Sequence, residues 1–241
     1  MVTGQKTIVG YNAQVAVDAK HKLIVEQHVT NAATDMGLLA AIAGAARETL
    51  GVERIDAVAD MDYYKGEDIE VCEANGITPY VARPKRGSAI ANGRFPKDLF
   101  RYDAEADAYH CPGGRTLDIS YRAVTRGHAN IQYSNPAACA ACTIKPRCTS
   151  SRWRRINRWE NEAVLDRMAT RLAARPGILN VRRETVEHPF GSIKQWMNQG
   201  AFLMRGLEKV RAEFSLTALA YNLRRAITLI GVPGLIRAMQ A

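Results

Sequence analysis

The sequence predicts a mixed α/β fold, and the order of segments in the first third of the chain is the main reason. Two strands are expected over residues 8–17 and 23–30, where apolar residues alternate with polar or small ones. A helix rich in Ala and Leu is expected over residues 36–50, followed by an apolar strand, Ile55–Ala59, that ends at Asp60. Strands that alternate with a helix in this way are typical of a sheet with helices packed on it.

Local signals mark where these elements begin and end. The polar turn at residues 18–22 joins the first two strands. Asp35 is expected to cap the helix over residues 36–50, and Gly51 is expected to end it. Further elements are expected as a helix over 66–75, a short strand over 78–82, and helices from about 160, over 182–196 and over 206–230. In the last helix an apolar stripe is interpreted as core: Leu207, Val210, Phe214, Leu216, Leu219, Leu223, Ile227 and Ile230.

The regular pattern stops at Pro84 and resumes near Glu160, which predicts three parts. Residues 1–83 form the first part of a mixed α/β core that carries Asp60. Residues 84–159 form a basic, Cys-rich insertion. Residues 160–241 form a C-terminal helical part of the core that carries Glu187.

Composition excludes several classes of protein. The 241 residues are 47% hydrophobic and 24% charged, which is typical of a globular protein rather than a disordered one. No run approaches the roughly 18 apolar residues of a membrane helix, and the first residues lack the apolar core of a signal peptide. We therefore expect a soluble, cytoplasmic, nucleoid-associated protein with no membrane partner.

The charge indicates a polyanionic partner such as DNA. Lys and Arg number 33 against 24 Asp and Glu, for a net charge of +9. Within residues 147–158, Arg152, Arg154 and Arg155 stand beside Trp153 with no acidic residue among them. Guanidinium groups suit phosphates and tryptophan faces suit bases, although a solvated basic surface is an equal alternative for such a run.

Four of the five cysteines are clustered in the insertion. Cys111, Cys139, Cys142 and Cys148 lie in a stretch rich in Gly, Pro and Asn, with few apolar residues to build a core of its own. A tetrahedral thiolate site would supply cross-links there, so a structural zinc ion is expected, with reduced, metal-free thiols as the alternative. Cys72 stands alone and is interpreted as a small core residue.

Two acidic residues stand in positions suited to a metal. Asp60 follows a buried strand that would fix its backbone and leave its carboxylate open, although a turn or cap role is the simpler interpretation. On a helix, Arg183, Glu187 and Lys194 would share one face, as would Gly191. That set fits a metal-plus-phosphate site, and it equally fits an ordinary surface salt-bridge ladder.

A resemblance favours the functional interpretation. The segments 9–18, 57–64, 186–194 and 219–223 resemble, in that order, a bacterial insertion-sequence transposase of the DDE class. The spacing Arg183-x3-Glu187-x6-Lys194 matches the signature Tyr-x2-Arg-x3-Glu-x6-Lys of one group of these enzymes, with Asn180 in the place of the Tyr. The resemblance implies a ribonuclease-H-like fold, DNA transposition as the function, and Asp60 and Glu187 as the second and third acids of an Asp-Asp-Glu triad.

The resemblance also implies partners, and the sequence differs from the family in one respect. It implies Mg²⁺ or Mn²⁺ held by the triad, phosphates held by Arg183 and Lys194, and a homo-oligomer on the DNA of element termini and targets. The family's first Asp precedes the segment that begins at Gly10, where this sequence has no acid, so the chain resembles a C-terminal part truncated at its N-terminus. Asp18 is interpreted as a turn residue. Two hypotheses remain: an enzyme that cleaves and transfers DNA strands, or an inactive remnant that binds DNA and folds around zinc.

Overall fold

The computed structural model describes residues 2–3, 6–7, 10–85, 87–125 and 127–240. The chain divides into two compact units. The first unit comprises Met1–Arg83 and Arg167–Ala241, and the second comprises Pro84–Asp166.

The first unit contains two separate pairs of longer strands. β3 (Asn12–Val17) and β4 (Ile24–Thr30) form an antiparallel pair, and β5 (Ile55–Ala59) and β6 (Ile77–Val81) form a parallel pair. Of the strand expected over residues 8–17, residues 8 and 9 lie outside the described part of the chain, and the strand begins at Asn12. A further short pair, β1 (Val2–Thr3) with β2 (Lys6–Thr7), precedes them.

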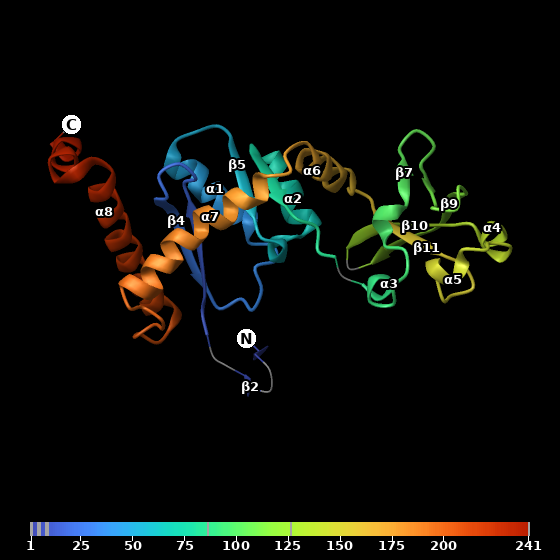
Figure 1. Ribbon diagram of the computed structural model, residues 1–241, viewed down its shortest axis with the longest axis horizontal. Helices are drawn as coiled ribbons and strands as arrows, with labels where there is room; N and C mark the ends of the chain where they lie inside the picture. Colours follow the sequence, from blue (N-terminus) through green and yellow to red (C-terminus); the bar gives the residue numbers. More distant parts are fainter. Residues whose placement is uncertain (1, 4–5, 8–9, 86, 126, 241) are drawn as a thin grey trace. The chain divides into compact units, whose positions relative to one another are not determined.

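Two helices join these strand pairs. α1 (Leu39–Leu50) contacts β3, β4, β5 and β6, and α7 (Ile178–Gly191) contacts β3, β5 and β6. Figure 1 shows α7 running past the region that holds β4, α1 and β5. The expected mixed α/β fold is therefore confirmed, and it is consistent with a ribonuclease-H-like core. The unit also contains α2 (Gly66–Ala74) and most of α6 (Ala163–Ala174).

The beginning of α1 differs from the expectation. The helix starts at Leu39, and Asp35 does not cap it. The carboxylate of Asp68, on α2, accepts hydrogen bonds from the backbone N–H groups of Leu39 at 2.9 Å and Ala40 at 3.4 Å. A residue from a neighbouring helix thus satisfies the free amides of the first turn, which sequence spacing alone does not reveal. The expected end is confirmed, because Gly51 adopts the left-handed conformation with φ 63°.

The C-terminal helix α8 (Leu207–Gln240) corrects the interpretation of its apolar stripe. Val210 and Phe214 are buried together with Ile24, Val29 and Ile193. The stripe residues Leu216, Leu219, Leu223, Ile227 and Ile230 are exposed. The helix packs on β4 and on the turn Ser192–Trp196, so only the side that faces them enters the core. Gly231, with φ 68°, interrupts the helix. No helix in the described part of the chain is long and apolar enough to cross a membrane.

The second unit is built on an antiparallel sheet that the sequence did not predict. Its strand order is β11-β10-β9-β8-β7. The expectation that this segment lacks apolar residues for a core of its own is wrong, because Phe100, Tyr109, Leu117, Tyr133 and Ile156 are buried together. These residues are far apart in the sequence, so no short segment contains enough apolar residues to indicate a core. The strands are β7 (Arg101–Asp103), β8 (Ala108–His110), β9 (Thr116–Thr125), β10 (His128–Ser134) and β11 (Arg155–Trp159), and the short helices are α3 (Ser88–Ala91), α4 (Pro136–Ala140) and α5 (Lys145–Cys148).

The cap supplied by Asp68 gives a stability prediction. Asp68→Ala removes the acceptor for the first amides of α1 and is expected to lower the free energy of unfolding by about 1–2 kcal/mol. Denaturant unfolding followed by circular dichroism measures the change. Glu48→Ala, on the exposed side of the same helix, is the control and is expected to stay within about 0.5 kcal/mol of the native protein. Equal stabilities of the native chain and the Asp68→Ala variant would contradict the capping role.

Candidate active site and nucleic-acid interface

Asp60 lies where β5 ends and a short 3₁₀ helix, Met61–Tyr63, begins. Its carboxylate does not cap that helix. Instead, it forms an ion pair with the guanidinium of Arg182 on α7, with 3.2 Å between Oδ2 and Nη2. Both side chains are about one-third exposed, at 36% and 35%, so the pair is accessible from solvent. β5 thus fixes the backbone of Asp60 and leaves its carboxylate open.

A second carboxylate lies close to this pair. Asp35 accepts hydrogen bonds from the side-chain amides of Asn12 at 2.5 Å and Gln14 at 3.1 Å. Burial raises the pKa of Tyr63, the charges of Asp35 and Asp60 raise it further, and Arg182 lowers it. The negative charges of Asp35 and Asp60 thus both act on the phenol of Tyr63.

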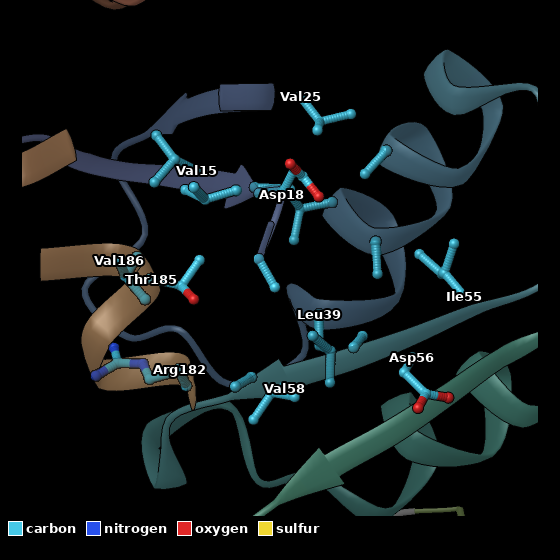
Figure 2. A pocket seen from close by; sticks show the side chains of 18 of the residues that line it. Val15, Asp18, Val25, Leu39, Ile55, Asp56, Val58, Arg182, Thr185 and Val186 are labelled. Atoms are coloured by element: carbon cyan, nitrogen blue, oxygen red, sulfur yellow. The ribbon is translucent and has the colours of Figure 1, made fainter. Parts of the chain in front are cut away.

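A cavity of ≈ 370 Å³ lies beside Asp60. Its lining comes from β3, β5, α1 and α7, and includes Asp60, Tyr63 and Arg182. Figure 2 shows Val15 of β3 on one side of this space, Val58 of β5 on the other, and Thr185 and Val186 of α7 beside them. The cavity therefore separates the two strand pairs of the first unit.

Glu187 lines a second cavity, of ≈ 1060 Å³. Lys194, Arg182 and Arg205 line the same cavity, so one carboxylate shares it with three cationic side chains. Arg183, which the sequence placed on the face of Glu187 and Lys194, is not among the lining residues. α7 runs through Pro189 into a π-helical turn, Ser192–Trp196, which alters the angular spacing from Glu187 to Lys194 but not that from Arg183 to Glu187.

The two cavities meet at α7. Arg182 and Val186 line both of them, and Arg182 is the residue that pairs with Asp60. Asp60 lines only the first cavity and Glu187 only the second. Among the described residues, no three His, Cys, Asp or Glu side chains are grouped so that they could hold a metal ion. The carboxylates have the oxygen donors that Mg²⁺ prefers, but they do not converge on one point.

The basic segment of the second unit contains both exposed and half-buried arginines. Arg152 and Arg155 are exposed, and their guanidinium groups lie 5.5 Å and 5.0 Å from the centre of the Trp153 ring. Arg154 is half-buried: it lies 4.8 Å from the Phe100 ring centre and donates to the Cys148 carbonyl at 3.1 Å. Arg152 and Arg155 are therefore open to a ligand, whereas Arg154 is engaged inside the unit.

Arg158, in the same run, belongs to the core of the second unit. Its guanidinium lies 3.7 Å from the centre of the Tyr102 ring and pairs with Asp166 at 2.6 Å. It also donates to the hydroxyl of Tyr109 at 3.3 Å. Although burial lowers its pKa, the bonds to Asp166 and Tyr109 raise it above the usual value, so the charge is paired within the fold.

The four clustered cysteines line one small cavity. Cys111, Cys139, Cys142 and Cys148 surround a space of ≈ 30 Å³ together with Arg154. Burial raises the pKa of the Cys148 thiol, Arg154 lowers it, and the other three thiols raise it. The fold thus brings together thiols separated by up to 37 positions (148 − 111 = 37). Cys72 is fully buried, and burial raises its pKa to about 12, which confirms its interpretation as a core residue.

Comparison with known proteins gives one match. A family profile described as Transposase DDE domain matches residues 110–227, a range that includes the four clustered cysteines, Arg158, Arg182 and Glu187. The match supports a DDE-class transposase. Asp60 lies before the matched range, so its assignment depends on its geometry and on the resemblance described above. No curated protein and no solved structure matches the chain.

Asp18 has the turn role expected for it. Its carboxylate accepts from the backbone N–H groups of His21 at 2.6 Å and Lys20 at 3.2 Å. Its Oδ2 also lies 3.1 Å from the Nδ1 of His21. Although burial raises the pKa of Asp18, these bonds lower it below the usual value, so the carboxylate is stabilised by the hairpin turn.

Three residues of the candidate site are not predicted as functional from the sequence. Arg182 was passed over in favour of its neighbour Arg183, because the signature spacing starts there. Asp35 was interpreted as a helix cap, which its position before an Ala- and Leu-rich helix favoured. Tyr63 stands in the segment 60–64 that carries the family resemblance, and this was the signal that could have identified it.

Proposed function

We propose that this chain provides the phosphoryl-transfer site of a DDE transposase, which cleaves DNA and transfers strands with divalent metal ions. The observation that carries the proposal is the position of Arg182. It pairs with Asp60 and also lines the cavity that holds Glu187 and Lys194. A cationic side chain between two acids suits a site that receives both metal ions and phosphate.

Each residue of the site has a proposed role. Asp60 and Glu187 would hold Mg²⁺ or Mn²⁺, and such ions activate water or a 3′-hydroxyl and stabilise the leaving oxygen. Lys194 and Arg182 would bind phosphate oxygens of the strand, positioning it without reading its bases. Arg183 is exposed on α7 and would contact phosphates outside the cavity. The carboxylate of Asp60 would have to leave Arg182 in order to bind a metal ion, because the same oxygen atoms would bind either partner.

The second unit would bind DNA without sequence preference. Arg152 and Arg155 flank the face of Trp153, which gives two cations and one stacking surface in an exposed position. Arg154 contributes by fixing the loop that carries them, through its bond to Cys148. We propose the DNA of element termini and targets as the partner, bound by a homo-oligomer of this chain.

Zinc is proposed as a structural ion of the second unit. Cys111, Cys139, Cys142 and Cys148 line one cavity, and four thiolates are a common donor set for structural zinc. In the described residues the four sulfur atoms are not yet grouped as ligands of one ion. Binding would therefore draw the short helices α4 and α5 closer to Cys111.

The alternative is a catalytically inactive remnant that binds DNA. It is favoured by the fact that Asp60 and Glu187 line different cavities, so two acids alone hold an ion weakly. Under either hypothesis the chain by itself is a poor catalyst. The two hypotheses differ in whether Asp60 and Glu187 matter for the remaining activity.

One prediction from this proposal tests the acids. Incubation of the purified chain with terminal DNA and Mg²⁺ or Mn²⁺ is expected to give slow cleavage. Asp60→Asn and Glu187→Gln are each expected to lower the cleavage rate by about 10²–10³-fold, the scale for removing one stabilising group from a transition state. Glu184→Gln and Asp62→Asn are the matched controls, on the same helix and the same turn, and are expected to keep the native rate.

The outcomes separate the hypotheses. Equal background cleavage by the native chain and by both variants would refute the enzymatic proposal and favour the remnant. Fast cleavage that both substitutions abolish would show that a third acid is already in place. Asp35→Asn would then identify it, because Asp35 is the carboxylate that shares Tyr63 with Asp60.

The second prediction concerns salt. The logarithm of DNA affinity is expected to fall linearly with the logarithm of salt concentration, with a slope of about −0.9 per phosphate contacted. Replacing Arg152 and Arg155 with alanine is expected to reduce that slope by about 1.8, because two contacts are lost. The double variant Arg101→Ala/Arg115→Ala removes the same charge elsewhere and is the control. Affinity that is unchanged between low and moderate salt would contradict phosphate binding.

The third prediction concerns zinc. Elemental analysis of protein purified under reducing conditions is expected to give about one zinc ion per chain. Cys139→Ser is expected to lose the ion, whereas Cys72→Ala, in the other unit, is expected to retain it. A folded protein without zinc, in which all four clustered thiols react freely, would exclude the site.

A further inference from the structure

The loop of residues 198–206 joins the π-helical turn Ser192–Trp196 to α8 and forms part of the cavity that holds Glu187. Arg205 is exposed at the end of this loop and lines the cavity together with Glu187 and Lys194. It forms no ion pair with another residue in the part of the chain that the structure describes. Its guanidinium is therefore open to an anion that enters the cavity.

A carboxylate on α8 holds the backbone of this loop. Oε1 of Glu213 accepts a hydrogen bond from the N–H of Leu203 at 2.9 Å, and Oε2 accepts one from the N–H of Met204 at 2.9 Å. Oε1 also accepts from the side-chain amide of Gln199 at 3.1 Å. The bonds from the two backbone amides hold the pKa of Glu213 below its usual value, so the acceptor is charged at neutral pH. The two residues directly before Arg205 are thereby fixed in place.

The loop is also anchored on the other side of Arg205. The N–H of Gly206 donates to the hydroxyl of Tyr11 at 2.8 Å. Phe202 packs edge-on against two aromatic rings, with its ring centre 6.1 Å from that of Tyr11 and 6.1 Å from that of Phe214. A loop that is held on both sides of one exposed arginine presents that side chain from a defined place.

The charges of the cavity favour a ligand with more than one phosphate. Among the described residues that line it, the acid is Glu187 and the cations are Arg182, Lys194 and Arg205. Arg182 is already paired with Asp60, which leaves Lys194 and Arg205 for a ligand. A volume of ≈ 1060 Å³ accommodates a ligand larger than a single phosphate group. A DNA strand, which carries one phosphate per nucleotide, fits these two cations.

We infer that Arg205 binds a backbone phosphate of the DNA strand in this cavity, and that Glu213 is a positioning residue that fixes the loop presenting it. The inference rests on the proposed function, which supplies the DNA but gives neither residue a role. A guanidinium binds a phosphate through two parallel hydrogen bonds, so its place must be well defined. Because Glu213 orders the loop before DNA arrives, the binding step does not have to supply the cost of ordering it.

DNA binding by the full chain tests the inference without the chemical step. The probe is a short fluorescein-labelled DNA duplex of arbitrary sequence, in buffer without divalent metal ions, and fluorescence anisotropy is measured over a series of salt concentrations. Absence of DNA binding by the native chain would contradict the proposed function and the inference together. Binding by the native chain that does not depend on Arg205 would overturn the inference alone.

The salt dependence reports the phosphate contact of Arg205. Arg205→Ala is expected to weaken binding and to make the slope of log affinity against log salt shallower by about 0.9, the value for one lost phosphate contact. Arg237→Ala removes the same charge from an exposed position near the other end of α8 and is expected to keep the native slope. A native slope for Arg205→Ala as well would show that this residue does not contact phosphate.

The direction of the effect at Glu213 distinguishes positioning from charge. Glu213→Ala is expected to weaken DNA binding by about fivefold to tenfold, because the loop must then be ordered at the binding step. Loss of a negative charge by itself would strengthen binding to DNA. Glu208→Ala removes the same charge from an exposed position on α8 and is expected to bind at least as tightly as the native chain. Unchanged or stronger binding by Glu213→Ala would refute the positioning role.

A double variant separates positioning from a general loss of structure. If Glu213 acts through Arg205, Arg205→Ala/Glu213→Ala binds no more weakly than Arg205→Ala alone, whereas two losses that multiply would refute that coupling. If circular dichroism shows that Glu213→Ala does not fold, Tyr11→Phe takes its place. This substitution removes the acceptor for Gly206 and keeps the ring that packs on Phe202. It is expected to weaken binding only when Arg205 is present, and an equal loss without Arg205 would overturn the role of the loop.

Discussion

The first unit depends on two helices that hold together two strand pairs with no backbone pairing between them in the described part of the chain. α1 and α7 each contact strands of both pairs. In a continuous sheet, ladder hydrogen bonds would fix the distance from β3 to β5. Here side-chain packing on the helices fixes that distance. The positions of the residues on α7, Arg182 and Glu187 included, therefore depend on how the helices pack.

This constraint explains the electrostatics of the site. Asp60 is held by its strand, whereas its cationic partner is held by α7, so the ion pair spans elements that meet across the cavity. A pair that is one-third exposed contributes little to stability, and its value lies in keeping the carboxylate oriented and accessible. The same guanidinium lines the cavity of Glu187, so α7 contributes one cationic side chain to the surroundings of both acids.

The sequence predicted well what depends on local pattern. Strand Ile55–Ala59, the end of α1 at Gly51 and the burial of Cys72 follow from apolar runs, turn chemistry and residue size. Prediction from the sequence failed where residues distant in the chain form one feature. The cap from Asp68 comes from another helix, and the core around Tyr109 and Tyr133 is assembled from separate strands. The signature spacing indicates Arg183, whereas the structure pairs its neighbour Arg182 with Asp60, which follows a strand distant in the sequence.

The core of the second unit also changes what its cysteines can contribute. Phe100, Tyr109 and Tyr133 pack around its sheet, and the charge of Arg158 is neutralised there by Asp166. A fold with such a core does not require a metal to become compact, unlike small domains that are unfolded without zinc. Cys139, Cys142 and Cys148 belong instead to the short helices α4 and α5 and the segments beside them, outside the sheet. Any ion held there would order this loop region, and through the bond from Arg154 to Cys148 it would fix the segment that presents Arg152, Trp153 and Arg155.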